Sequence, residues 1–250
     1  MKRFLFLAAA VVAAAPMFAE SNVELPEKGT LSTEVQINPF DQDGNTFKLD
    51  GIKLRYFITD KDALRAKVGF GLTSNSTKDD IVGTDPYSPT EKMSVQHKQK
   101  SGDFSFDLGY ERHFFTSGRI DLYGGAQVGV SRHFASASIV EGSEKLDYTN
   151  CIPSDFSVDA SNLSKLSDRG YLGWNLDIFT GIDFYLYKGL FVGTELGLSM
   201  QNQKLSKAKY EYVSGEASSS QITKGETTDK TKSFDARFQI EPTLRIGWTF

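Results

Sequence analysis

The sequence predicts an all-β protein: an eight-stranded antiparallel transmembrane β-barrel with short periplasmic turns and long extracellular loops. Three observations lead to this fold: a secretion-type N-terminal segment, stretches in which apolar and polar residues alternate, and connections that are alternately short and long. Hydrophobic residues make up 39% and charged residues 24% of the 250 residues. This balance suits neither a disordered chain nor a bundle of transmembrane helices.

The N-terminal segment predicts export. Lys2 and Arg3 precede an unbroken apolar run over residues 4–15, which is too short to cross a membrane as a helix. We expect residues 1–19 to be a signal peptide and residues 20–250 to form one outer-membrane β-barrel domain. Cleavage after Ala15 is the alternative.

Composition excludes several classes of function. The net charge of −4 argues against nucleic acid as a partner, because phosphate binding requires a basic face. A single cysteine, Cys151, excludes a disulfide framework and a cysteine-based metal site. The acidic stretch 41–45 resembles a calcium loop, but its glycine comes too early and Ile52 stands where the loop needs Glu. We therefore expect a tight turn there, with no metal and no cofactor.

Seven segments before the last one alternate with a period of two, which predicts strands with one apolar and one polar face. The first two are weaker: residues 31–39, and residues 47–58, where a slip near Gly51 predicts a bulge. The other five are residues 64–72, 104–110, 120–130, 172–186 and 190–200.

The C-terminal segment has the clearest pattern. Between Phe234 and Phe250 the even positions are apolar and the odd positions are polar or glycine, apart from Pro242 at an even position. We predict one strand with a bend or bulge at this proline, since proline weakens a central strand.

The connections predict which end of the barrel carries the loops. Short segments at 41–46, 59–63, 115–118 and 187–189 contrast with long polar segments near 74–100, 140–169 and 212–232. The tight turns at 59–63, 115–118 and 187–189 alternate with these long segments, which places all the long loops at one end, as in outer-membrane barrels.

The residue types at alternate positions predict which face is enclosed. A soluble lipocalin-like barrel would keep its apolar side chains inside. Here the polar set is rich in glycine, which weakens a solvent-exposed strand but leaves room in a narrow interior for long charged side chains. The apolar set carries aromatic residues near the strand ends, as an interfacial girdle would. We therefore expect the apolar set to face lipid.

With this sidedness, charged residues line the lumen: a basic wall from the second and third strands faces an acidic wall from strands four to seven. The residues are Glu34, Lys53, Arg55, Arg65, Lys67, Asp107, Glu111, Asp121, Asp177, Asp183, Glu195, Arg237, Glu241 and Arg245. Buried charges have to pair. We expect a structural network of ion pairs that plugs the lumen; a narrow or gated pore is the alternative.

These features resemble the small outer-membrane protein β-barrel domain family, of the eight-stranded OmpA/OmpX-like kind. The most specific element is the end of the last strand, with Leu244, Ile246, Trp248 and Phe250 at alternate positions. The resemblance implies that this ending is the signal read by the barrel-assembly machinery. It also implies integral residence in the outer membrane of a Gram-negative bacterium.

The sequence predicts no enzyme. Outer-membrane enzymes need a histidine near a serine or carboxylate, whereas His97 falls in a predicted loop, and His113 and His133 fall near opposite ends of the lumen. We expect a monomer in outer-membrane lipid, with a structural role and an unknown extracellular ligand at its long loops. Cys151 falls in one of these loops, as a free thiol or in an intermolecular disulfide.

Overall fold

A computed structural model describes residues 23–37, 49–82, 92–154, 163, 165–214, 220–229, 231–239 and 244–250. All the regular structure in these ranges is β-structure. The strands are β1 (Leu31–Ile37), β2 (Leu49–Phe57), β3 (Asp62–Val82), β4 (Lys92–Ser117), β5 (Ile120–Glu141), β6 (Glu144–Thr149), β7 (Cys151–Pro153), β8 (Leu166–Arg169), β9 (Tyr171–Tyr187), β10 (Leu190–Leu205), β11 (Lys209–Ser214), β12 (Gln221–Glu226), β13 (Lys232–Gln239) and β14 (Leu244–Thr249).

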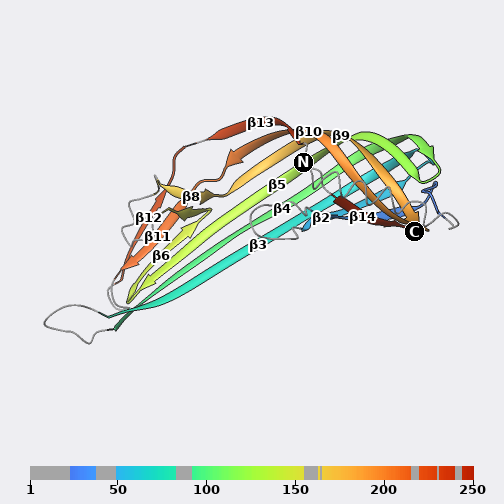
Figure 1. Ribbon diagram of the computed structural model, residues 1–250. Coiled ribbons are helices and arrows are strands. Elements are labelled where there is room, and N and C mark those ends of the chain that lie inside the picture. Colours follow the sequence, from blue (N-terminus) through green and yellow to red (C-terminus); the bar gives the residue numbers. More distant parts are fainter. Residues whose placement is uncertain are drawn as a thin grey trace, which may run out of the picture.

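Eight strands form a closed antiparallel ring. Hydrogen bonding runs in the order β1, β2, β3, β4, β5, β9, β10 and β14, and β14 pairs back with β1. The prediction of an all-β antiparallel fold with eight strands around a closed ring is confirmed (Figure 1). Over the described ranges, no helix has the length and apolar character needed to cross a membrane.

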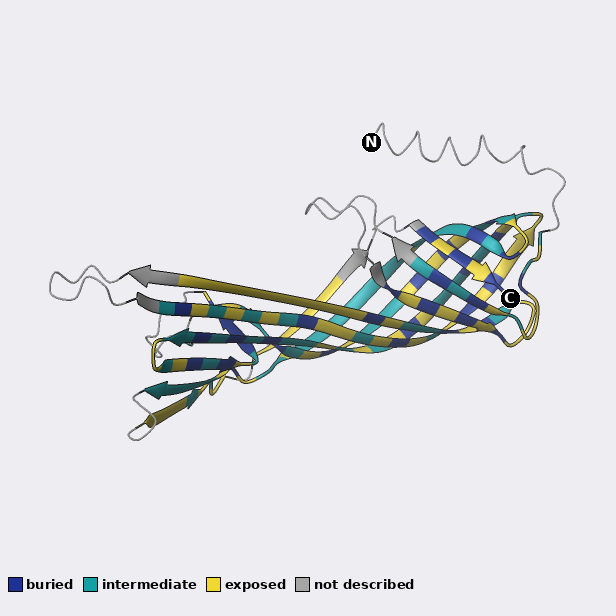
Figure 2. Cartoon of the chain, turned by 90° about the horizontal axis from the view of Figure 1, so that it is seen from below, coloured by how far each residue is buried: buried dark blue, intermediate teal, exposed yellow. Residues whose placement is uncertain are grey.

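The tight turns of the ring lie at one end, where the C-terminus also lies (Figure 2). Residues 58–61 join β2 to β3, residues 118–119 join β4 to β5, and residues 188–189 join β9 to β10. Gly118 and Lys188 adopt positive φ angles of 60° and 46°, as short hairpin connections require. The predicted turn at 41–46 lies outside the described residues.

Side chains alternate between the inside and the outside of the ring along each strand, as the pleat requires. Most inward positions are buried or half-buried and most outward positions are exposed or half-buried, and buried and exposed colours alternate along several strands in Figure 2. The exposed outward side chains form a belt that we call the apolar band. It includes Ile52, Leu54, Leu64, Val68, Phe70, Leu72, Phe104, Leu108, Val128, Val130, Leu172, Trp174, Ile178, Leu196, Ile246 and Trp248. As predicted, apolar side chains lie outside and charged ones inside.

The prediction of long polar loops at 74–100, 140–169 and 212–232 is wrong in large part, because strands occupy much of these segments. β3, β4 and β5 continue far beyond the ring and pair along their whole length. β4 alone has 26 residues, or roughly 85 Å at about 3.3 Å per residue. β6, β11 and β12 extend this surface, so a six-stranded sheet, which we call the projecting sheet, stands on one side of the ring (Figure 1).

The projecting sheet has its own hydrophobic core on the face that continues the interior of the ring. Ala135, Ala137 and Ile139 of β5 occupy inward positions, and Leu146 and Tyr148 of β6 lie beside them. The β7–β8 hairpin packs on this face and contributes Cys151 and Ile152. The prediction that Cys151 lies in a loop is therefore wrong: its thiol is free but buried in this core.

Two irregularities occur where the sequence predicts them. Val35 pairs with Ile52 and Ile37 pairs with Leu49, so β2 holds one extra residue next to Gly51, whose φ is 147°. This confirms the predicted bulge. On β10, Gly197 pairs with Gln239 of β13 and Gly193 pairs with Arg245 of β14. Gly193 and Gly197 are four positions apart, whereas their partners are six positions apart. The C-terminal segment therefore holds two extra residues at this point. Pro242 lies between these partners, outside the described residues.

Burial of Cys151 predicts an unreactive thiol. Burial raises its pKa to about 11, so at pH 8 alkylation should be roughly 100-fold slower than for an exposed cysteine, because the thiolate is the reacting form. The rate is measured with iodoacetamide on the folded protein. The matched control is the double variant Cys151→Ser/Ser143→Cys, which carries its thiol in the exposed β5–β6 turn. Equal rates would contradict the packing of the β7–β8 hairpin.

Candidate functional site

The interior of the ring holds a network of buried charges to which all eight ring strands contribute; we call it the ion-pair network. Its members are Glu34 of β1, Lys53 and Arg55 of β2, Arg65 of β3, Glu111 and His113 of β4, Asp121 of β5, Asp183 of β9, Glu195 of β10 and Arg245 of β14. Each residue occupies an inward position of its strand. The network therefore follows from the strand alternation combined with the closure of the ring.

Four residues form a closed cycle at its centre. Arg55 donates from Nη2 to Glu34 Oε2 and from Nη1 to Asp183 Oδ2, both at 2.8 Å. Arg245 donates to the remaining oxygens of the same carboxylates, at 2.6 Å to Asp183 Oδ1 and 3.1 Å to Glu34 Oε1. Each carboxylate thus bridges two guanidinium groups, and no charge in the cycle is left without an opposite partner.

A second set of contacts is centred on Glu195. Arg65 contacts both oxygens of this carboxylate at 3.1 Å, and Lys53 lies 3.2 Å from Oε2. Lys53 also contacts Glu34 at 2.6 Å, which joins this set to the central cycle. Such bidentate and shared contacts offset the cost of removing the charges from water.

Near the short turns the network ends in a histidine–carboxylate pair. His113 Nδ1 lies 2.6 Å from Asp121 Oδ2, and Nε2 lies 3.4 Å from Glu111 Oε1. Thr116 donates to the other oxygen of Asp121 at 2.9 Å. His113 thus lies near one end of the lumen, as expected from the sequence, with both ring nitrogens next to carboxylates.

Aromatic rings fill much of the remaining space, and they are not among the interior residues expected from the sequence. The Arg65 guanidinium lies 3.7 Å from the ring centroid of Phe179, and that of Arg55 lies 4.8 Å from the centroid of Phe191. Arg55 and Arg245 both lie 5.4 Å from the centroid of Tyr123. These are cation–π distances. A signal was present: the aromatic residues stand at odd positions, in the polar set of their strands.

Interior glycines make room for these rings as well as for charged side chains. A Cβ on Gly247 would overlap the ring of Phe191 and come within 2.7 Å of the Thr33 carbonyl oxygen. A Cβ on Gly181 would overlap the ring of Tyr123. The glycines at positions 181 and 247 are therefore explained by close approach of the buried rings opposite them.

Two predicted members of the acidic wall lie apart from the network. Asp107 accepts a hydrogen bond from Asn175 at 2.7 Å, and Asp177 accepts from Gln127 at 2.7 Å and from Ser199 at 2.6 Å. Amides and a hydroxyl thus satisfy these carboxylates. Lys67 is half-buried and lies opposite Asp107 in the β3–β4 register.

The remaining predicted site residues belong to the C-terminal strands. Glu241 lies outside the described residues, and for Arg237 and Leu244 only the backbone positions in β13 and β14 are described. Ile246, Trp248 and Phe250 face outward and are exposed. Within the described ranges, no group of three or more His, Cys, Asp and Glu residues could hold a metal ion.

A separate histidine cluster stands where the ring meets the projecting sheet. His133 Nδ1 lies 2.7 Å from Asp103, and Nε2 lies 3.0 Å from both oxygens of Asp168 in β8. The ring of Tyr171 stacks on His133 at 5.4 Å. Burial disfavours the imidazolium, but the two carboxylates outweigh burial and raise the pKa of His133. His97, predicted in a loop, lies in β4 instead.

A family model described as "Putative OmpA-OmpF-like porin family" matches residues 40–250 of the chain. This range contains most of the ring and the whole projecting sheet. A search of the curated proteins finds no match.

Loss of one network cation should be strongly destabilising. Arg245→Gln leaves Glu34 and Asp183 partly unpaired in the interior, and should lower the free energy of unfolding by about 3–5 kcal/mol. Urea unfolding of the purified, folded protein measures the change. Arg112→Gln is the matched control, because its pair with Asp62 at 3.2 Å has an exposed arginine and should contribute little. Equal losses for the two variants would contradict the buried network.

The His133 cluster predicts a pH-dependent hairpin. Because the pKa of His133 is raised in the folded protein, its stabilising effect is fully present below the ordinary value of about 6.5. The effect is lost as the pH rises through the folded-state pKa. Hydrogen exchange of β7 and β8, corrected for intrinsic rates, should therefore show decreasing protection with rising pH. His133→Gln should abolish this dependence, and a dependence that persists in this variant would refute the assignment.

Proposed function

The chain belongs to the OmpA-OmpF-like porin family, and from this premise we propose that it is a monomeric β-barrel in the outer membrane of a Gram-negative bacterium. The observation that carries the proposal is the combination of an exposed apolar band outside the ring with paired charges inside it. A closed ring leaves no unpaired edge in hydrocarbon, which is the condition for crossing lipid with strands. The apolar band is then the surface in contact with lipid.

We propose that the interior is a plug rather than a channel. An eight-stranded barrel is only just wide enough for side chains. Here arginines, carboxylates and aromatic rings occupy the inward positions and are almost inaccessible to solvent, including Arg55, Arg65, Tyr123 and Phe191. The plug has a structural role, because each strand is tied to strands across the ring. We assign no catalytic role to it.

We further propose that the projecting sheet is the surface through which the protein meets an extracellular ligand. The sequence predicted that loops would form this surface, and we now assign it to a rigid sheet. Its strand β4, which continues from the ring, has 26 residues, and the sheet has its own hydrophobic core. Binding residues on rigid scaffolds keep their geometry.

Residues 1–19 would direct export, and the exposed side chains of Ile246, Trp248 and Phe250 would present the signal to the barrel-assembly machinery.

A narrow or gated pore is the second candidate, favoured by the porin-like family. Its physical basis is that three cations share one carboxylate: Glu195 contacts Lys53, Arg65 and Arg245 at 3.1–3.4 Å. Exchange among these partners would be the gating step.

Planar-bilayer recording separates the two candidates. The wild-type protein should give no stable unitary currents, because buried ion pairs close the lumen. The double variant Arg65→Ala/Glu195→Ala removes a bidentate pair and should open a measurable conductance. Lys145→Ala/Asp147→Ala, which removes an exposed pair at 2.7 Å in the projecting sheet, is the matched control and should remain silent. Stable unitary currents in the wild type would refute the plug and support the pore.

A further inference from the structure

The outward face of the protein is strongly basic just beyond the apolar band, on the side of the projecting sheet. Six exposed cations lie there, and we call them the basic girdle: Lys78 of β3, Lys98 and Lys100 of β4, Arg132 of β5, Lys204 of β10 and Lys232 of β13. All six stand at even positions, which continue the outward positions of the ring. They therefore extend from the same surface as the apolar band.

The strand registers place part of the girdle directly against apolar side chains, whereas Lys78 and Lys98 lie further out, opposite Gln96 and Ser76. Arg132 is paired with Phe104 on one side and with Leu172 on the other. Leu172 is in turn paired with Lys204. Lys100 lies two outward positions beyond Phe104 on β4. These cations thus stand at the border of the band, within side-chain reach of where lipid headgroups would lie.

The charge of this region has one sign. The first three outward positions beyond the band carry no acidic residue on β3 (Ser74, Ser76, Lys78), β4 (Gly102, Lys100, Lys98) or β5 (Arg132, Phe134, Ser136). This is notable in a chain whose net charge is −4. Within the described part of the chain, no ion pair involves a girdle residue. The outward acids of the neighbouring strands are paired already: Asp147 with Lys145 at 2.7 Å and Glu211 with Lys224 at 2.9 Å.

One contact in the girdle is unfavourable by itself. Lys204 and Lys232 are direct cross-strand neighbours on β10 and β13. Like charges in this arrangement destabilise a sheet, and an anion bound between them would reverse the effect. Two cations held side by side therefore point to an anionic ligand.

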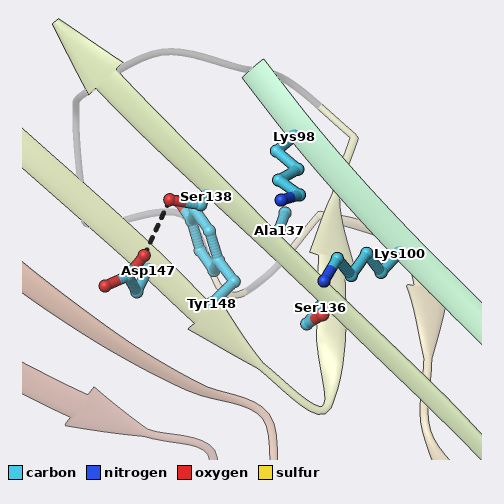
Figure 3. Close-up of a pocket in the computed structure, with 7 residues that line it drawn as sticks. All are labelled: Lys98, Lys100, Ser136, Ala137, Ser138, Asp147 and Tyr148. Carbon is cyan, nitrogen blue, oxygen red and sulfur yellow. Dashed lines mark hydrogen bonds between the residues drawn. The ribbon is translucent and has the colours of Figure 1, made fainter. Parts of the chain in front are cut away.

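A hollow on the same face supplies further donors (Figure 3). It has a volume of about 210 Å³ and is lined by Lys98, Lys100, Ser136, Ala137, Ser138, Asp147 and Tyr148. In Figure 3 the side chains of Lys98 and Lys100 reach from β4 toward β5. The one carboxylate, Asp147, is engaged by the Ser138 hydroxyl at 2.8 Å and by Lys145. Ammonium and hydroxyl groups around a hollow suit phosphate oxygens.

We propose that the basic girdle binds the phosphate groups of anionic lipids in the leaflet on the side of the projecting sheet. This inference rests on the proposed function, because the acyl chains of such a lipid would lie along the apolar band. The combination of cations and an apolar border selects a phosphorylated lipid over a free anion. Exposed cations near the short turns are Lys28, Lys61, Lys188 and Arg112, and of these Arg112 is paired with Asp62.

The test measures lipid binding to the purified, folded protein in nonionic detergent by native mass spectrometry. The probes are dioleoyl phosphatidic acid and dioleoyl phosphatidylcholine, which share acyl chains and differ in headgroup charge. The wild type should prefer phosphatidic acid, and the preference should weaken with salt. Arg132→Gln/Lys204→Gln/Lys232→Gln should reduce the affinity for phosphatidic acid at least tenfold, and Lys98→Gln/Lys100→Gln should reduce it in the same direction.

The matched control is Lys28→Gln/Lys61→Gln/Lys188→Gln, which removes the same charge from exposed positions near the short turns and should bind like the wild type. Equal losses in both triple variants, or no preference of the wild type for phosphatidic acid, would overturn the proposal. Displacement of the lipid by equimolar inorganic phosphate would assign the girdle to a free anion instead.

Insertion into vesicles of pure phosphatidylcholine distinguishes failure of the membrane barrel from failure of the lipid-binding proposal. A wild type that fails to insert would refute the membrane barrel itself. Insertion of all variants with unchanged lipid selectivity would refute only the girdle.

Discussion

Closure of the strand ring is the constraint on which the rest of the structure depends. A closed sheet has an interior that side chains cannot leave, and the pleat sends every second residue into it. Any charge at an inward position therefore needs a partner inside the ring, either an opposite charge or a hydrogen-bonding side chain. Glu34, Arg55, Asp183 and Arg245 meet this condition as a cycle of shared contacts. The outside of the same strands is free to be apolar.

The same alternation of inward and outward side chains runs through the ring and through the projecting sheet, but the two faces differ in polarity between them. On β5 the inward side chains are polar or charged within the ring, for example Asp121 and Gln127, and become apolar at Ala135 and Ile139. The outward side chains change in the opposite sense, from Val128 to Ser138. This reversal marks the border between the part of the chain that packs around charges and the part that packs around its own hydrophobic core. The His133 cluster lies at that border.

Alternation and turn positions could be predicted from the sequence, because both are local. The loop at 74–100 was predicted wrongly because residues 74–80 of β3 are polar on both faces, which removes the periodic signal although their backbone pairs with β4. The apolar residues at odd positions from Ala135 to Ile139 were the available sign of a second core. The partners within the network could not be predicted, because Glu34 and Arg245 are 211 residues apart and meet only through the register of β1 and β14.

The length of β4 has a consequence for how such a chain can change over time. Its inward side chains at Val95, Asp107 and Glu111 are buried, whereas Lys98, Lys100 and Leu108 are exposed. Gain or loss of a single residue in the middle of this strand would exchange the two faces of everything on one side of it. Only events that add or remove residues in pairs, or that are absorbed in a bulge, preserve both faces. Natural length variation among relatives should therefore be even-numbered within strands and unrestricted in the connections.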